Sequence, residues 1–156
     1  MAGAGQQQLP NMHATALVVG ETGILVTGQP GSGKSALALQ LMRSAKQAGR
    51  FAVLVADDQV GLKAAAGRAI AVAPPATAGL IEIRGSAIVS VPHLRRAVMH
   101  VVISLDPSGD QPRLPDPQDR YDLGNGIVLP LLRFRPGGGG DPLALLEAFE
   151  KGRLLR

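Results

Sequence analysis

The stretch Gly28-Gln29-Pro30-Gly31-Ser32-Gly33-Lys34-Ser35 decides the fold of this 156-residue chain. It matches the P-loop pattern G-x-x-x-x-G-K-[ST] at every required position. The apolar run at 23–27 before it predicts a buried strand, and leucine and alanine recur at helical spacing after it. A strand, a glycine-rich turn and a helix are the context that this motif needs.

The motif predicts a phosphate-binding loop. Glycine lets the backbone approach a ligand closely and point successive N–H groups inward, at the positive end of the following helix. A triphosphate fits that concavity, with Lys34 reaching the β- and γ-phosphates and the Ser35 hydroxyl ligating Mg²⁺. We therefore expect a nucleoside triphosphate to be bound by eight consecutive residues: Gly28, Gln29, Pro30, Gly31, Ser32, Gly33, Lys34 and Ser35.

Composition narrows the class of protein. The chain carries a formal charge of +4, which suits an anionic ligand, but it has no dense Lys/Arg run and only four aromatic residues. A role in nucleic-acid binding is therefore disfavoured. The absence of cysteine excludes disulfides and thiol catalysis. No apolar run reaches the length of a membrane span, and a nucleotide-dependent enzyme fits the cytoplasm.

The order of elements predicts a loose tail over residues 1–11, followed by a single domain over 12–156. We expect a hairpin of strands at 13–19 and 24–27, then a helix to about Gln47. A strand at 51–56 should then pair in parallel with the P-loop strand. Further strands are predicted at 60–62, 69–72, 80–85, 88–92, 98–105 and 127–134. Residues 106–119 read as a long loop, and Asp141 as the N-cap of a last helix.

Two consecutive carboxylates end the strand after the P-loop helix. Asp57 and Asp58 should face the nucleotide, because the carboxyl ends of parallel strands meet at one edge of a sheet. One carboxylate can help to hold Mg²⁺, and the other can accept the proton of an attacking hydroxyl.

Four ordered motifs together resemble the catalytic domain of bacterial HPr kinase/phosphorylase. His13 opens a strand before the P-loop strand, and Val55-Ala56-Asp57-Asp58 resembles the acidic motif of that family. Residues 80–85 and 88–91 are similar to its second signature, and Leu129-Pro130 with Arg135-Pro136-Gly137 to its C-terminal loop. The family usually carries an N-terminal domain, so the resemblance is to a short, single-domain form of the kind seen in some proteobacteria.

The resemblance implies an ATP- and Mg²⁺-dependent kinase that phosphorylates a serine of an HPr-like phosphocarrier protein and reverses the reaction with inorganic phosphate. It implies an α/β fold like that of phosphoenolpyruvate carboxykinase, with a mixed, mainly parallel sheet, and a hexamer. The composition itself predicts that the protein binds neither nucleic acid nor membrane.

The resemblance also implies the roles of individual residues. Asp57 would be the general base, and the acid in the reverse reaction, with His13 beside the acidic pair and Arg84 anchoring the signature loop or the transferring phosphate. Ser35 would ligate Mg²⁺, with Asp58 and Glu82 at or near the metal.

One departure from the family pattern bears on the reverse reaction. The family loop usually continues Pro-Gly-Arg-Asn. Here Pro136-Gly137 is followed by Gly138, Gly139 and Gly140, which complete the glycine run from Gly137 to Gly140. This change argues against phosphorolysis more than against kinase activity, and leaves open whether Arg133 or Arg135 replaces the missing arginine. A small-molecule kinase and a nucleotide-sensing regulator that acts through a protein partner are the alternative functions.

Overall fold

The computed structural model describes residues 5–105 and 119–152. The part of the expected N-terminal tail at residues 7–11 is instead a strand, β1 (Gln7–Met12), which pairs antiparallel with β5 (Val60–Ala65). The sequence predicted a tail because it is rich in glutamine. In the structure, all but one of the side chains of β1 are partly or fully exposed, as such a composition requires. Leu9 is the exception and is buried in the core.

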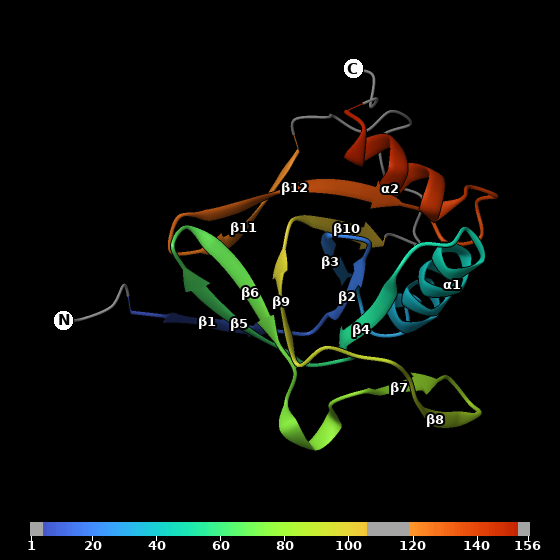
Figure 1. Cartoon of the computed structure of the whole chain (residues 1–156), viewed down its shortest axis with the longest axis horizontal. Helices are drawn as coiled ribbons and strands as arrows, with labels where there is room; N and C mark the ends of the chain where they lie inside the picture. Colours follow the sequence, from blue (N-terminus) through green and yellow to red (C-terminus); the bar gives the residue numbers. More distant parts are fainter. Residues whose placement is uncertain (1–4, 106–118, 153–156) are drawn as a thin grey trace.

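A six-stranded mixed sheet carries the P-loop helix (Figure 1). The predicted hairpin is β2 (Thr15–Val19) with β3 (Thr22–Thr27), and α1 (Lys34–Gln47) follows the P-loop. The helix ends before Gly49, whose φ of 73° continues no right-handed helix. The remaining strands are β4 (Ala52–Ala56), β10 (Val101–Leu105), β11 (Arg120–Gly124) and β12 (Ile127–Phe134).

The strand order β11-β12-β10-β3-β2-β4 differs from the predicted sheet. Only the β12/β10 and β10/β3 pairings are parallel, so the expectation of a mainly parallel sheet is wrong for the described strands. The strand β4 pairs with β2 and not with β3, because β2 lies between β3 and β4 in the sheet. Both β3 and β4 run antiparallel to β2, so their carboxyl ends still share one edge.

Two smaller sheets complete the fold. The first has the order β1-β5-β6-β9, with β6 (Arg68–Val72) and β9 (Arg96–Met99). The second is the hairpin of β7 (Leu80–Ile83) and β8 (Ala87–Ser90), which follows the short 3₁₀ helix η1 (Pro75–Thr77). The last helix, α2 (Pro142–Glu150), begins at Asp141, whose carboxylate accepts a hydrogen bond from Leu143 N, as the sequence predicted.

The single strand expected at 98–105 is two strands, β9 and β10. The chain leaves the four-stranded sheet and enters the six-stranded sheet at His100. Nδ1 of His100 accepts a hydrogen bond from Gly23 N at 2.8 Å, while His100 N donates to Gly23 O. The expected loop at 106–119 falls, except for Asp119, outside the described residues.

Alternating side chains of the six-stranded sheet fill two core layers. Ala16 and Val18 of β2 pack toward the four-stranded sheet, whereas Leu17 and Val19 pack toward α1 and α2. Both faces of the central strands are therefore buried, which explains their uninterrupted apolar sequences. Neither helix in the described part of the chain is long and apolar enough to span a bilayer.

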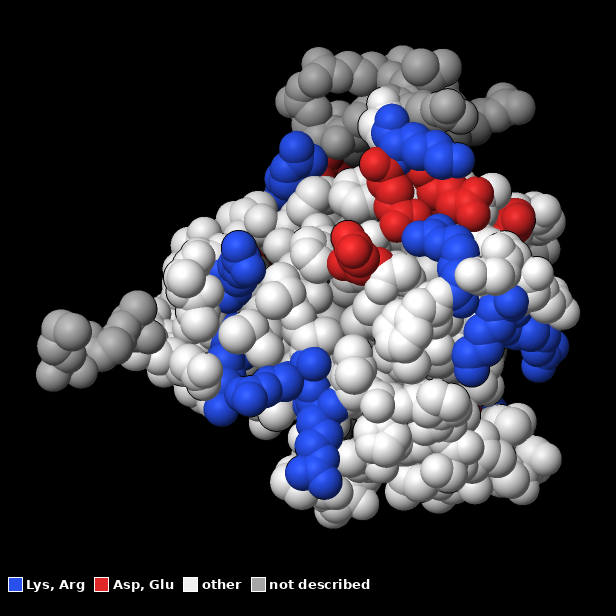
Figure 2. Space-filling model, in the orientation of Figure 1, with Lys and Arg blue, Asp and Glu red and all other residues white. Residues whose placement is uncertain are grey.

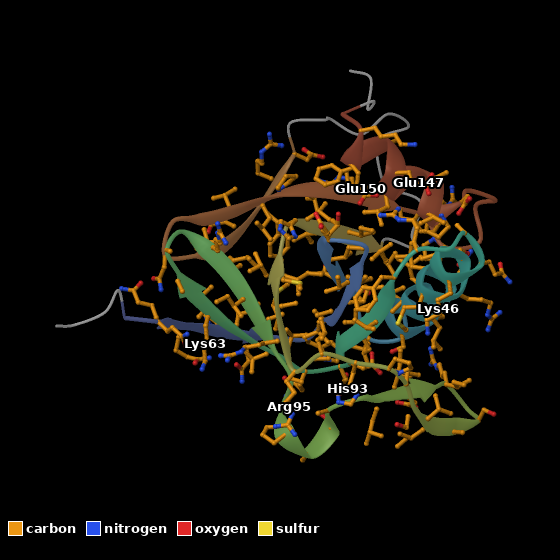
Figure 3. The ribbon with its side chains drawn as sticks, in the orientation of Figure 1. Lys46, Lys63, His93, Arg95, Glu147 and Glu150 are labelled. Carbon is orange, nitrogen blue, oxygen red and sulfur yellow. The ribbon has the colours of Figure 1, made fainter. Side chains whose placement is uncertain are left out.

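An ion-pair cluster fastens α2 to the rest of the domain, and its two carboxylates on α2, Glu147 and Glu150, are labelled in Figure 3. Nη1 and Nη2 of Arg50 donate to the two carboxylate oxygens of Glu150 at 3.0 and 2.9 Å. Thr22 Oγ1 donates to the same carboxylate at 2.7 Å, and Glu147 lies 3.7 Å from Arg50. Burial raises the pKa of the Glu150 carboxyl, but the hydrogen bonds from Arg50 and Thr22 and the attraction of Arg50 lower the pKa below its usual value overall.

Candidate functional site

The P-loop has the backbone geometry that the sequence predicts. Gly33 caps α1 with a φ of 100°, in a region that side chains with a Cβ rarely adopt. Lys34 is 93% buried, and its Nζ donates to Gly28 O at 3.0 Å and to Gln29 O at 3.2 Å. The lysine therefore folds back over the loop, where its ammonium group can exchange these carbonyls for phosphate oxygens.

Ser32 carries a buried polar atom without a partner. Its Oγ is fully buried and makes no hydrogen bond among the described residues. Buried hydroxyl groups are nearly always hydrogen-bonded, so such an atom needs an explanation. Its place inside a phosphate-binding loop fits a ligand that supplies the missing hydrogen bond.

Asp57 is tied to the P-loop and to the second signature at once. Its Oδ1 accepts hydrogen bonds from Ser35 Oγ at 2.7 Å and from Thr15 Oγ1 at 2.8 Å. Its Oδ2 accepts from Glu82 N at 3.2 Å. A carboxylate next to the P-loop serine hydroxyl is placed to support a bound metal ion.

Asp58 points elsewhere, although it is the next residue. Its φ of 71° is left-handed, which Asp tolerates better than most residues and which is uncommon enough to suggest a functional constraint. Oδ1 of Asp58 lies 3.2 Å from Nδ1 of His13, and the Asp58 side chain is 70% exposed. The bend at His13, between β1 and β2, and the turn after β4 thus place His13 beside one member of the acidic pair.

The β7–β8 hairpin closes the site from the other side. Glu82 reaches Asp57 through its backbone N–H, and Nη1 of Arg84 donates to Gly31 O of the P-loop at 3.3 Å. Gly31 has a φ of 79°, and a Cβ at this position would lie 2.9 Å from Arg84 Nη1. The positive φ of Gly31 therefore favours glycine at this turn, whereas the tip of the flexible Arg84 side chain could shift to accommodate a Cβ.

Most of these groups line one cavity of about 330 Å³, but Asp57 and Ser32 lie behind its lining. Its polar part contains most of the predicted site residues, and its apolar part is formed by side chains of the P-loop, α1 and β7. Sequence reasoning missed Thr15, although a threonine within a buried apolar strand is a detectable signal. It also missed Ala36, Leu39 and Ile83, which form an apolar wall together with the predicted Pro30.

The glycine-rich C-terminal loop lies beside this site but not in it. A second cavity of about 480 Å³ is lined by Gly137, Gly139 and Gly140 and shares Gly33 and Ala36 with the first. Neither candidate substitute for the missing arginine lines the first cavity. Nε of Arg133 donates to Asp119 at 3.0 Å, and Arg135 is exposed. Among the described arginines, only Arg84 lines the P-loop cavity.

Comparison with known proteins identifies the family. The family model described as HPr Serine kinase C-terminal domain matches residues 6–101, which is more than half of the chain. This chain belongs to that family. A solved structure of the Hpr(Ser) kinase/phosphatase from Coxiella burnetii is similar with a TM-score of 0.73 and 29% identity, covering 92% of this chain and 95% of that one.

Curated relatives of this family member are named HPr kinase/phosphorylase. The protein from Clostridium tetani is 40% identical over 83 residues, which are 53% of this chain and 25% of the relative. The protein from Clostridium novyi is 33% identical over 137 residues, which are 81% of this chain and 43% of the relative. The chain thus spans less than half the length of these relatives. The fold similarity confirms the predicted α/β catalytic domain of this family.

Proposed function

We propose that the protein is an ATP-dependent kinase that phosphorylates a serine of an HPr-like phosphocarrier protein. The observation that carries the proposal is that two neighbouring carboxylates, Asp57 and Asp58, have different partners. Asp57 is hydrogen-bonded to the P-loop Ser35, while Asp58 lines the P-loop cavity with its side chain exposed. Phosphoryl transfer needs one group beside the metal and another that is able to accept a proton.

The residues fit Mg²⁺ and ATP. The backbone of the loop, the buried Lys34 and the unpartnered Ser32 hydroxyl suit phosphate oxygens. Ser35 Oγ would ligate Mg²⁺, with Asp57 orienting that hydroxyl and Glu82 near the metal. Because Mg²⁺ keeps several waters and uses substrate phosphates as ligands, a small set of protein ligands is sufficient. Bound Mg²⁺ would neutralise charge on the phosphates.

The contacts favour Asp58 over Asp57 as the general base. Both oxygens of Asp57 already accept hydrogen bonds, three in all, which fixes the carboxylate and uses most of its acceptor capacity. Asp58 has only His13 as a described side-chain partner and is open to the cavity. We therefore assign the base role to Asp58 and the metal-side role to Asp57, the reverse of the division that the resemblance implies.

In the proposed reaction, the acceptor serine is the nucleophile. Its Oγ forms a bond to the γ-phosphorus while the bond from that phosphorus to ADP breaks, and the hydroxyl proton moves to Asp58. His13 stabilises and orients Asp58 through their 3.2 Å contact. Arg84 holds the hairpin against the P-loop and can stabilise charge on the transferring group.

The site supports the forward reaction better than phosphorolysis. The glycine loop that replaces the arginine of the family pattern lines a neighbouring cavity and brings no cationic side chain to the P-loop cavity. We expect transfer from ATP to exceed transfer from phosphoserine to inorganic phosphate.

Incubation with labelled ATP, Mg²⁺ and HPr from the source organism tests the proposal. We expect label on one serine of HPr, lost in Asp58→Asn, with ATP binding retained in that variant. Binding of ATP without label on HPr would overturn the kinase proposal and support the nucleotide-sensing alternative. Excess phosphate added to labelled HPr measures the reverse rate.

A cytoplasmic location and assembly into a hexamer stay predictions. Light scattering of the purified protein would measure the assembly state directly.

A further inference from the structure

We propose that the outer face of the β7–β8 hairpin is the docking surface for the protein that carries the acceptor serine. It would recognise an uncharged, aliphatic surface next to that serine. This inference rests on the proposed function and adds the chemistry by which the acceptor is selected.

The segment that contains the hairpin is almost free of charge. Between Pro74 and Leu94 the only acidic or basic side chains other than His93 are Glu82 and Arg84, and both line the P-loop cavity. In the space-filling view, the surface formed by β7 and β8 at the lower right is largely white (Figure 2). Leu80, Ile83, Ile88 and Leu94 are the large hydrophobic side chains that this segment exposes, and exposed apolar side chains that lie together are typical of an interaction site.

The pairing register separates the two faces of the hairpin. Ile81 pairs with Val89 on the inner face, where Ile81 is fully buried and Val89 packs against the cluster that contains α1. Leu80 and Ile88 lie on the outer face, because successive residues of a strand point to opposite sides. They are 37% and 71% exposed, and Ile88 is the most exposed large hydrophobic side chain among the described residues.

This outer face continues into the catalytic cavity. Ile88 is the register partner of Glu82, so their Cβ atoms are about 5 Å apart. Two hydrogen bonds, one on each side of Ile83, attach the hairpin to the site. Glu82 N donates to Asp57, and Arg84 donates to Gly31 O. A protein that brings a serine hydroxyl into the cavity past this hairpin must therefore contact Ile88.

The same continuity argues against a second copy of this chain as the occupant. A copy seated on Leu80 and Ile88 would lie against Glu82, which lines the P-loop cavity, and would compete with the acceptor for that space. An acceptor protein satisfies both requirements at once, because burying the aliphatic face also places its serine. Because Leu80 and Ile88 are uncharged, we expect their share of this contact to depend little on salt.

Replacement of the exposed aliphatic side chain by a neutral polar one tests the surface without adding charge beside Glu82. We expect Ile88→Gln to raise the KM for HPr about fivefold or more, with kcat and the dissociation constant of ATP unchanged. Val128→Gln is the matched control. Val128 is 48% exposed on β12, near the β11–β12 turn on the left of Figure 1, far from β7 and β8.

An unchanged KM for HPr in Ile88→Gln, or an equal rise in Val128→Gln, would overturn the docking proposal. A photo-crosslinker at position 88 separates this failure from failure of the kinase proposal, because it reports contact without phosphate transfer. Crosslinking to HPr supports the surface even if HPr is not phosphorylated. Crosslinking only between two copies of the chain, or none to HPr, overturns it.

Discussion

Oγ of Ser35 donates a 2.7 Å hydrogen bond to Oδ1 of Asp57, so the P-loop hydroxyl and the carboxylate after β4 act as one unit. Asp58 takes no part in this unit, because its left-handed φ of 71° turns it toward His13. Of the two adjacent carboxylates, Asp58 lines the cavity itself, and Asp57 supports the lining residues Ser35 and Thr15 from behind. We propose that they have different roles.

Substitution of each carboxylate by its amide should separate these roles. We expect Asp58→Asn to lower kcat for HPr phosphorylation by about 10²- to 10⁴-fold at saturating Mg²⁺, since the proton acceptor is lost. Asp57→Asn should instead weaken the apparent Mg²⁺ affinity by about 10- to 100-fold, as expected for a residue that orients a metal ligand. Steady-state rates at varied Mg²⁺ measure both. Recovery of Asp58→Asn by excess Mg²⁺ would contradict the assignment.

Removal of the unpartnered hydroxyl in the P-loop should have opposite effects with and without nucleotide. We expect Ser32→Ala to stabilise the free protein by about 1 kcal/mol, because a buried group without a hydrogen bond is removed. The same variant should gain less thermal stability from Mg²⁺ and ATP than the wild type. Thermal unfolding with and without nucleotide measures this, and an unchanged gain would show that Ser32 does not contact the ligand.

Acid should weaken the attachment of α2. The pKa of Glu150 is below its usual value of 4.5 despite the opposing effect of burial, because Arg50 and Thr22 donate hydrogen bonds to the carboxylate. A lowered pKa in the folded state stabilises the protein above pH 4.5, and this contribution is lost as pH falls through the folded pKa. We expect the difference in unfolding free energy between wild type and Glu150→Gln to shrink from pH 6 to 3, as measured by urea titration. A difference that is constant over this range would exclude the mechanism.

The contact between the β2–β3 hairpin and the β9–β10 junction leaves no space for a side chain. A Cβ on Gly23 would collide with the backbone oxygen of Val98 and lie 2.8 Å from Cε of Met99. We expect Gly23→Ala to cost about 3 kcal/mol of unfolding free energy, because backbone has to move. Gly140→Ala is the control, since its Cβ would meet Phe134 at an ordinary 3.5 Å. Denaturant unfolding of both variants gives the comparison.

Local sequence patterns predicted much of the fold and the P-loop half of the site. The strand before Gly28, the helix to Gln47 and the Asp141 cap follow from apolar spacing, glycine and capping chemistry within a few residues. The pairing of β1 with β5 and the passage from β9 to β10 at His100 were not predicted. Both depend on partners far along the chain, which a local pattern does not contain.

The sequence by itself determined that a phosphate-binding loop, an acidic pair and an Arg-containing signature occur in this chain. Only the tertiary structure decided which atoms meet. Because β2 lies between β3 and β4, Thr15 joins Ser35 at one oxygen of Asp57, while the turn at Asp58 directs the second carboxylate to His13. Such divisions arise from strand order and backbone dihedrals, which depend on long-range packing and not on the spacing of residues.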